Sequence, residues 1–287
     1  MTEKSNERAG TATTGHEWDG IQELDTPLPR WWLWTFYACI LFAIVWTIAY
    51  PAWPRLSGSA TPGLLGYSSR AAVAADIAHY NGKNAALEAK LVAADLAEVT
   101  SDVGLANFAT QGGAAIFRTR CATCHGAGAG GARGYPNLVD DDWLWGGSVE
   151  DVYQTVSHGV RFDKDEDTRT SEMPAFGDIL EGPEIAQLAQ YVLSISGQDH
   201  DAGAAGKGEA LFGDNCAICH GEGGTGGREF GAPNLTDAIW LYGGDADTIT
   251  ETITKARYGV MPAWAGQLSE SQIRQVAIWV HQQGGGE

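Results

Sequence analysis

Hydrophobic residues are grouped along the chain in a way that predicts one membrane-spanning helix and several amphipathic ones. Trp31 to Tyr50 is a run of 20 residues without a charge. At about 1.5 Å per residue, this run is long enough to cross a hydrocarbon layer of about 30 Å. Three tryptophans lie at its start, with Tyr50 and Trp53 at its end, as expected for side chains at the two membrane interfaces. We therefore predict a transmembrane helix over residues 31–50.

A cleaved signal peptide is the alternative interpretation of this run. Its leading region would be 30 residues long and acidic, and its apolar core exceeds the usual length of about 7 to 15 residues. An uncleaved anchor is therefore favoured. Basic residues on the two sides specify its orientation only weakly, and Cys39, which lies within the run, is assigned no function.

Two later stretches repeat apolar residues at the i, i+3, i+4, i+7 spacing of an amphipathic helix. The stripes are Ile185, Leu188, Ala189 and Val192 in the first stretch, and Ile273, Val276, Ala277 and Val280 in the second. Ser269 and Gln272 have the spacing of a capping box at the start of the second helix. We interpret both stripes as core.

The segment 51–107, between the anchor and these stretches, begins with the turn-rich run Pro51 to Gly66. Ala71 to Val99 is an alanine-rich helical segment, interrupted near Asn81-Gly82. It is either a spacer or a docking element for a partner subunit, and the sequence leaves both open.

The motif Cys-x-x-Cys-His occurs twice, as Cys121 to His125 and Cys216 to His220. Each copy is followed by Met-Pro-Ala, at Met173 and Met261, and these are the only methionines after the first residue. Residue types match along both copies: Ile116-Phe117 with Leu211-Phe212, Pro136-Asn137-Leu138 with Pro233-Asn234-Leu235, and Trp143 to Gly147 with Trp240 to Gly244. The chain therefore contains a duplicated domain, which we place at residues 108–198 and 203–287.

This combination is typical of c-type haem attachment, in which two thiols bond to the haem, the adjoining His ligates the iron and a thioether closes its other face. We predict two covalently bound haems c, held by Cys121 and Cys124 and by Cys216 and Cys219. The axial ligands would be His125 with Met173 at the first iron and His220 with Met261 at the second. No further Cys pair or His pair remains to complete a zinc site, and no βαβ pattern favours a redox dithiol.

The predicted fold is therefore all-α: an N-terminal transmembrane helix followed by two tandem cytochrome c domains of class I type. Each amphipathic helix is expected to pack against the helix that precedes the haem motif of its own repeat. Because c-type haem is attached on the outer face of energy-transducing membranes, residues 1–30 would be cytoplasmic and the haem domains periplasmic, at a bacterial inner membrane.

Residues around the motifs are candidates for a supporting role. A ligating imidazole usually donates its second N–H to a carbonyl, and the carbonyls of Pro136 and Pro233 are suitably spaced. Haem propionates have candidate partners in two arginines and two indoles, with ordinary surface or packing roles as an equally open alternative. These residues are Arg133, Arg228, Trp143 and Trp240.

The first repeat carries a twelve-residue insertion, Arg161 to Glu172, of which eight residues are charged. Alternating aspartates within it resemble a calcium loop, but Thr168 replaces the turn glycine and Pro174 the bidentate glutamate. A solvated acidic loop is favoured. His158, just before the insertion, is a weaker alternative to Met173 as a ligand of the first iron.

The net charge of −18, from 36 acidic and 18 basic residues, disfavours nucleic acid as a partner and would attract a basic electron carrier. Asp140 to Asp142 and the insertion are the densest acidic runs. They are our candidates for a docking surface, with simple solubilising charge as the alternative.

Nearly the whole chain resembles the dihaem subunit III of cbb3-type cytochrome c oxidases. The resemblance rests on His16 to Leu24 (His-Glu-Trp-Asp-Gly-Ile-Gln-Glu-Leu), Pro27 to Trp32, the anchor and the two haem motifs. It is weakest between Ser68 and Gln111.

This resemblance implies a carrier of electrons rather than an enzyme in its own right. Subunit III takes electrons from a soluble or anchored cytochrome c and passes them to a monohaem subunit, then to the catalytic haem-copper subunit, which reduces oxygen and pumps protons. A dihaem peroxidase is disfavoured because both irons would have filled axial positions. A dihaem electron-accepting subunit of a periplasmic dehydrogenase remains the alternative.

Overall fold

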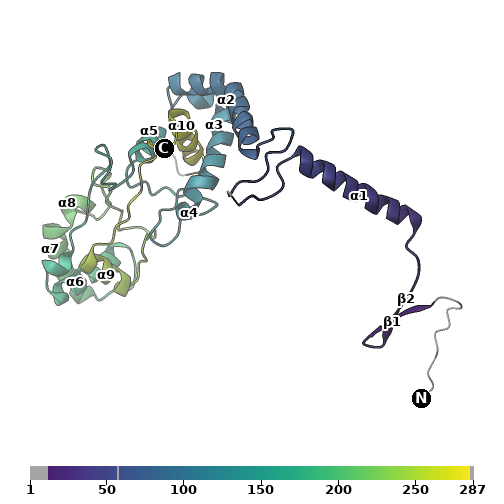
Figure 1. Cartoon of the computed structure of the whole chain (residues 1–287). Helices are drawn as coiled ribbons and strands as arrows, with labels where there is room; N and C mark the ends of the chain where they lie inside the picture. Colours follow the sequence, from purple (N-terminus) through teal and green to yellow (C-terminus); the bar gives the residue numbers. More distant parts are fainter. Residues whose placement is uncertain (1–11, 57, 285–287) are drawn as a thin grey trace, which may run out of the picture. The chain divides into compact units, whose positions relative to one another are not determined.

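The computed structural model describes residues 12–56 and 58–284 (Figure 1). The chain divides after Lys83 into two compact units. The first eleven residues of the predicted cytoplasmic segment and the last three of the second repeat lie outside the described residues.

The first unit contains a β-hairpin and an apolar helix. Strands β1 (Thr13–Trp18) and β2 (Ile21–Leu24) pair antiparallel. They are joined by Asp19 and Gly20, whose φ angles of 51° and 83° belong to the tight turn that Asp-Gly sequences favour. The hairpin was not predicted.

Helix α1, Arg30–Ala49, reproduces the predicted anchor to within one residue at each end. None of its side chains is buried against the rest of the protein. Among the described residues it is the one helix long and apolar enough to cross a membrane.

Helix α2, Ser69–Ala93, is continuous through Asn81-Gly82, so the predicted interruption is wrong. A glycine within an exposed helix costs only about 1 kcal/mol relative to alanine, and the surrounding alanines favour helix strongly enough to offset it.

The second unit is helical throughout, apart from isolated bridges and loops. Its elements are η1 (Val99–Ser101), α3 (Val103–Ile116), η2 (Phe117–Cys121), α4 (Ala122–His125), α5 (Val149–His158), η3 (Phe176–Asp178), α6 (Gly182–Ile195), α7 (Ala202–Asn215), α8 (Ala217–His220), α9 (Ala246–Lys255) and α10 (Glu270–His281). Every residue of the two predicted apolar stripes is buried, in α6 and α10. The capping box of Ser269 and Gln272 is present.

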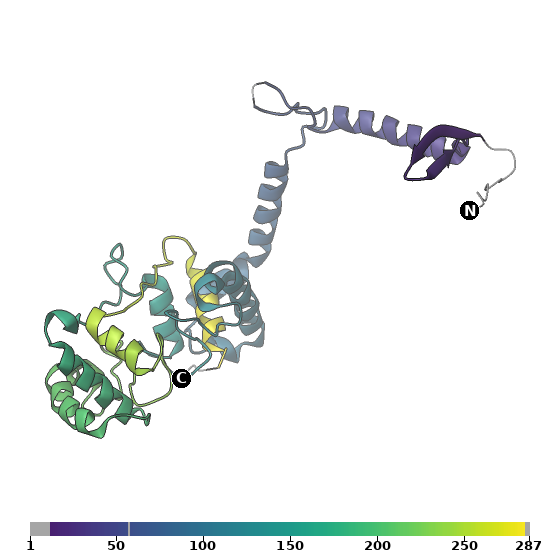
Figure 2. The ribbon, with the colours of Figure 1, turned by 90° about the horizontal axis from the view of Figure 1, so that it is seen from below.

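The closing helices are exchanged between the repeats. Helix α10 packs against α3 and α5, whereas α6 packs against α7 and α9 (Figures 1 and 2). The expectation that each closing helix packs on the opening helix of its own repeat is therefore wrong. The connection between α6 and α7 is only six residues long, Ser196 to Asp201, and helices joined by so short a connection usually pack as antiparallel neighbours.

Two apolar clusters result, each with contributions from both repeats. Cluster A joins Phe117 and Val156 to Val276 and Val280 of α10. Cluster B joins Leu188 and Val192 of α6 to residues of the second repeat, which include Phe212, Ile249 and Ile253. Cluster A is thus the core around the first haem motif, built from α3 to α5 with α10. Cluster B is the core around the second, built from α6 to α9.

A glycine marks each exchanged helix contact. A Cβ atom added at Gly113 of α3 would lie 2.1 Å from the carbonyl oxygen of Gln275 in α10. At Gly208 of α7 it would lie 2.2 Å from the carbonyl oxygen of Gln187 in α6. Both separations are below van der Waals contact, so only glycine allows these two backbones to approach so closely.

Replacement of Gly208 by alanine tests this packing. We expect Gly208→Ala to cost about 1–3 kcal/mol, because its methyl group overpacks the contact between α6 and α7. Gly206→Ala is the matched control, since the same helix has open space at Gly206 and alanine there should stabilise by up to about 1 kcal/mol. Thermal unfolding of the haem-loaded protein measures both; equal midpoints for the two variants would contradict the contact.

Candidate functional site

The second Cys-x-x-Cys-His motif lines a cavity of about 720 Å³, a size within the range of about 300–1,000 Å³ typical of ligand pockets. Cys216, Cys219 and His220 line it, and so does Met173 of the first repeat. Apolar side chains of cluster B complete the wall: Leu188, Val192, Phe212, Ile249 and Ile253.

The first motif has the corresponding arrangement with the other methionine. Cys121 and Ala122 pack against cluster A together with Met261, Trp143 and Trp264. Each methionine therefore lies with the haem motif of the other repeat. The pairing of His125 with Met173 and of His220 with Met261, expected from the sequence, does not match this packing, because each methionine leads into an exchanged helix.

The segment that carries Met261 forms a short antiparallel contact with the end of α5 and Val160, from which the chain leads through the insertion to Met173. The N–H of Val160 donates to the carbonyl of Met261 at 3.0 Å, and the N–H of Met261 donates to the carbonyl of Val160 at 3.0 Å. Trp264 continues this contact by donating its N–H to the carbonyl of Val156 at 3.1 Å. Backbone hydrogen bonds thus hold the segment of Met261 against the end of α5 and Val160.

Both motif histidines have the orientation of haem ligands. Nδ1 of His125 lies 3.0 Å from the carbonyl oxygen of Pro136, and Nδ1 of His220 lies 3.0 Å from that of Pro233. These are the carbonyls singled out from the sequence. Burial lowers the pKa of both imidazoles, against the opposing effect of the carbonyl hydrogen bond. A neutral ring with Nδ1 engaged keeps Nε2 available for a metal.

The motif thiols do not resemble a redox dithiol. Burial, with a smaller contribution from the neighbouring cysteine, raises the pKa of Cys121 to about 11 and that of Cys216 to about 11. Redox-active Cys-x-x-Cys pairs instead have lowered thiol pKa values. Paired thiols, an oriented imidazole and a thioether around an apolar cavity are the donor set that fits a c-type haem.

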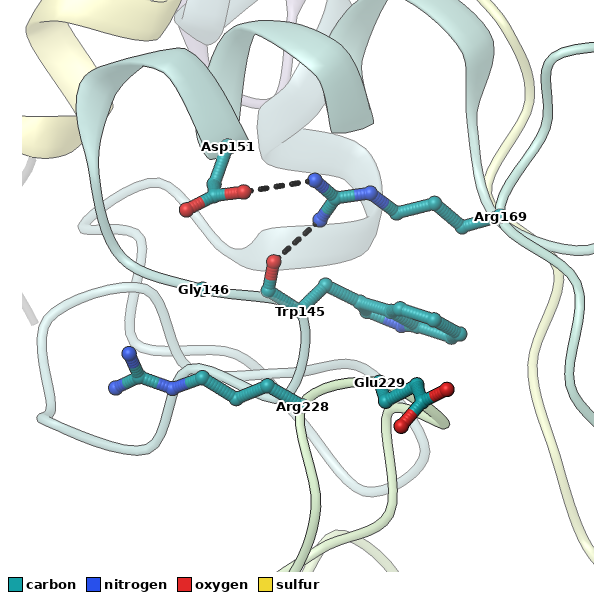
Figure 3. A pocket seen from close by; sticks show the side chains of 6 residues that line it. All are labelled: Trp145, Gly146, Asp151, Arg169, Arg228 and Glu229. Atoms are coloured by element: carbon teal, nitrogen blue, oxygen red, sulfur yellow. Dashed lines mark hydrogen bonds and ion pairs between the residues drawn. The ribbon is translucent and has the colours of Figure 1, made fainter.

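The four candidate propionate partners lie in different places. Arg133 and Trp240 line the cavity of the second motif, although Arg133 belongs to the first repeat. Trp143 packs on cluster A. Arg228 lines a separate pocket of about 420 Å³ with Arg169 and Asp151 (Figure 3).

The insertion is more firmly held than a solvated loop would be. Arg169 forms an ion pair with Asp151 of α5 at 2.9 Å and donates to the carbonyl of Trp145 (Figure 3). His158 places Nδ1 3.0 Å from Oδ1 of Asp165 and does not line the cavity beside Met173. Its contacts therefore tie the insertion to the end of α5.

Sequence reasoning missed several polar residues of the cavity wall, among them two arginines and a tyrosine. Arg161, Tyr242 and Arg257 all line it, and the guanidinium of Arg257 lies 4.8 Å from the ring centre of Tyr242. Arg161 opens the insertion and Arg257 aligns with Ser157, so neither has a counterpart in the other repeat that would have marked it.

Comparison with known proteins matches this arrangement to one family. A family model described as cytochrome c oxidase, cbb3-type, subunit III matches residues 108–192 and again residues 203–280. The chain belongs to this family. A second model, the N-terminal domain of cytochrome oxidase-cbb3, FixP, matches residues 10–57, which include the β-hairpin and α1.

Similar proteins extend over the full length of this subunit III chain. It is 57% identical over 277 residues to the cbb3-type cytochrome c oxidase subunit CcoP of Cereibacter sphaeroides, covering 96% of this chain and 95% of the relative. It is 52% identical to CcoP of Rhodobacter capsulatus, with both chains fully covered. It is 51% identical to subunit FixP of Azorhizobium caulinodans, covering 97% of this chain and 94% of the relative.

Membership of the subunit III family confirms the resemblance and favours the oxidase over the dehydrogenase alternative. The cbb3-type domains imply c-type haem, and a subunit of an oxidase complex implies partner subunits. Together with α1, the family indicates membrane anchoring.

Acidic groups of this subunit III chain also border the cavity. Asp140 and Asp142 line it and are partly buried, so only Asp141 of that predicted docking run is exposed. Burial, reinforced by the charges of Asp237 and Asp140, raises the pKa of Asp142 to about 6. Because Asp237 belongs to the second repeat, the two repeats share one acidic cluster.

The raised pKa makes a pH-dependent contribution to stability. In the unfolded chain Asp142 loses its proton near its ordinary value of 3.8, but in the folded chain only near 6. Its ionisation therefore destabilises the fold progressively between about pH 4 and pH 6, and by a constant amount above that.

Asp142→Asn should remove this pH-dependent loss of folding stability, because asparagine does not ionise. We expect the thermal midpoint of the variant to exceed that of the wild type at pH 7 by more than it does at pH 4. Asp141→Asn, at the exposed neighbouring position, is the control and should change little. A difference between Asp142→Asn and wild type that stays constant with pH would contradict the assignment.

Proposed function

We propose that this chain is the dihaem electron-relay subunit of a cbb3-type cytochrome c oxidase. The observation that carries the proposal is the duplicated site: each Cys-x-x-Cys-His motif is packed with one methionine in an apolar surrounding, within a chain of the subunit III family. Each haem c, when bound, supplies a one-electron couple.

The chain's own residues would hold two haems in a crossed arrangement. Cys121 and Cys124 attach one haem, with His125 and Met261 on its iron. The other is attached by Cys216 and Cys219, and its iron is held by His220 and Met173. Support comes from the shared surroundings: Met261 and Cys121 both pack against cluster A, and Met173 and Cys216 both pack against cluster B.

Filled axial positions suit electron transfer rather than catalysis. Ligation by His and Met gives a high potential, which is appropriate for accepting electrons from a cytochrome c. Apolar clusters A and B exclude water from the ligands, and the carbonyls of Pro136 and Pro233 hold the imidazoles in one orientation. We infer that oxygen is reduced elsewhere, in the catalytic haem-copper subunit.

The surroundings follow from the same assignment. Electrons would come from a soluble or anchored cytochrome c, drawn by the acidic surface, and pass to the monohaem subunit. Helix α1 would anchor the chain in a bacterial inner membrane, with residues 1–30 in the cytoplasm and the two repeats, 108–198 and 203–287, in the periplasm.

Purification of a tagged chain from its own membranes in mild detergent tests the proposed complex. We expect b-type haem, copper and oxygen consumption driven by reduced cytochrome c to accompany two haems c per chain. Recovery of the two c haems alone or with a dehydrogenase would retain the carrier chemistry and reject the oxidase assignment.

The crossed ligands are tested in chains that keep one haem. In a Cys121→Ala, Cys124→Ala chain, the remaining haem should fall to lower potential with Met173→His, because the thioether is lost, and should be unaffected by Met261→His. The reciprocal Cys216→Ala, Cys219→Ala chain should respond in the opposite way. Redox titration measures both, and a response to the methionine of the same repeat would refute the crossing.

A further inference from the structure

Arg161 has an unusual backbone conformation directly after Val160, where the chain that leads to Met173 contacts the segment of Met261. Its φ of +54° lies in the left-handed region, where glycine is the usual residue. Strained backbone of this kind persists only where the surroundings hold it, and it is concentrated at functional positions. The surroundings of Arg161 therefore hold it in a backbone conformation that is unfavourable by itself.

The guanidinium group of Arg161 links the segment before Met261 to the segment before Met173. Nε donates to the carbonyl of Gly259 at 2.8 Å, two residues before Met261, and Nη1 donates to the carbonyl of Ser171 at 2.8 Å, two residues before Met173. Its centre lies 5.5 Å from the ring centre of Tyr258. These contacts hold the group in one place on the wall of the cavity that contains Cys216, Cys219, His220 and Met173.

The charge of Arg161 has less compensation than that of its neighbours. Arg257, on the same wall, is paired with Glu251 at 3.1 Å, and Arg169 is paired with Asp151 at 2.9 Å. The hydrogen bonds described for Arg161 go to carbonyl oxygens instead. Burial lowers the pKa of its guanidinium, while Tyr242, Glu172 and Tyr258 act in the opposite direction.

A half-buried cation facing a cavity is costly unless an anion approaches it. Haem carries two propionate groups, and a guanidinium matches a carboxylate in geometry as well as in charge. The cavity wall with Arg161 is thus suited to the polar edge of a haem, while the apolar walls with Leu188 and Phe212 are suited to its ring.

We propose that Arg161 is a positioning residue for the haem carried by Cys216 and Cys219, and that its charge raises the reduction potential of that haem. This inference rests on the proposed haem site and goes beyond it. Reduction adds one negative charge to the haem, and a nearby cation favours the reduced state. The insertion of the first repeat thereby adjusts the potential of the haem bound to the second.

Redox titration of the purified oxidase complex tests the inference, with haem content per chain measured first. At a fixed potential, Arg161→Gln should lower the ratio of reduced to oxidised haem about three- to tenfold for one c haem only, where tenfold corresponds to about 59 mV for a one-electron couple. Arg161→Lys, which keeps the charge, should restore most of the ratio. Met173→His identifies which haem has changed, since this variant should shift the reduction potential of the same haem.

Lys164→Gln is the matched control, because it removes one positive charge from an exposed position of the same insertion and should leave both waves in place. If Arg161→Gln loses haem, Glu172→Gln is the substitute, because it removes a negative charge from the same cavity wall. It should raise the reduction potential of this haem. The inference would be overturned if neither Arg161→Gln nor Glu172→Gln shifted the potential of this haem. It would also be overturned if Arg161→Lys, or the control Lys164→Gln, shifted the potential as much as Arg161→Gln does. A wild-type chain without haem at Cys216 and Cys219 would instead refute the proposed function.

Discussion

The close packing of α10 on α3, and of α6 on α7, is the contact on which both candidate haem sites depend. Each pair buries an apolar stripe, and each is close enough to require glycine, at Gly113 and at Gly208. Because Met173 and Met261 lie just ahead of α6 and α10, the choice of helix partner also determines which motif each methionine accompanies. Helix packing therefore sets which methionine lies beside which Cys-x-x-Cys-His motif.

Local chemistry could be predicted from the sequence because it is encoded at short range. The Cys-x-x-Cys-His motifs, the apolar stripes of α6 and α10, and the carbonyls of Pro136 and Pro233 all depend on residues close in the chain or on a repeated offset. The hairpin at Asp19-Gly20 carried an equally local signal, the dipeptide typical of a tight turn, and could have been recognised.

The exchange of helices could not be predicted in the same way. Both repeats present the same apolar periodicity, so α6 has two equivalent partners, α3 and α7, and the stripe fits either. The short connection before α7 decides between them, and its effect depends on the whole set of packing contacts. The wall residues Arg161 and Arg257 were missed because neither has a counterpart in the other repeat, and because the site that they face is assembled from both repeats.

The exchange of the closing helices α6 and α10 between the repeats also has a consequence for the order of assembly. Synthesis proceeds from the N-terminus, so Cys121 and Cys124 emerge long before Met261 and α10, which lie near the end of the chain. The region around Cys216, by contrast, follows Met173 and α6, and its core is completed by Leu235, Trp240 and α9. The motif that is made first is therefore the last to be enclosed, because its core lacks one wall until the final helix of the chain folds over it.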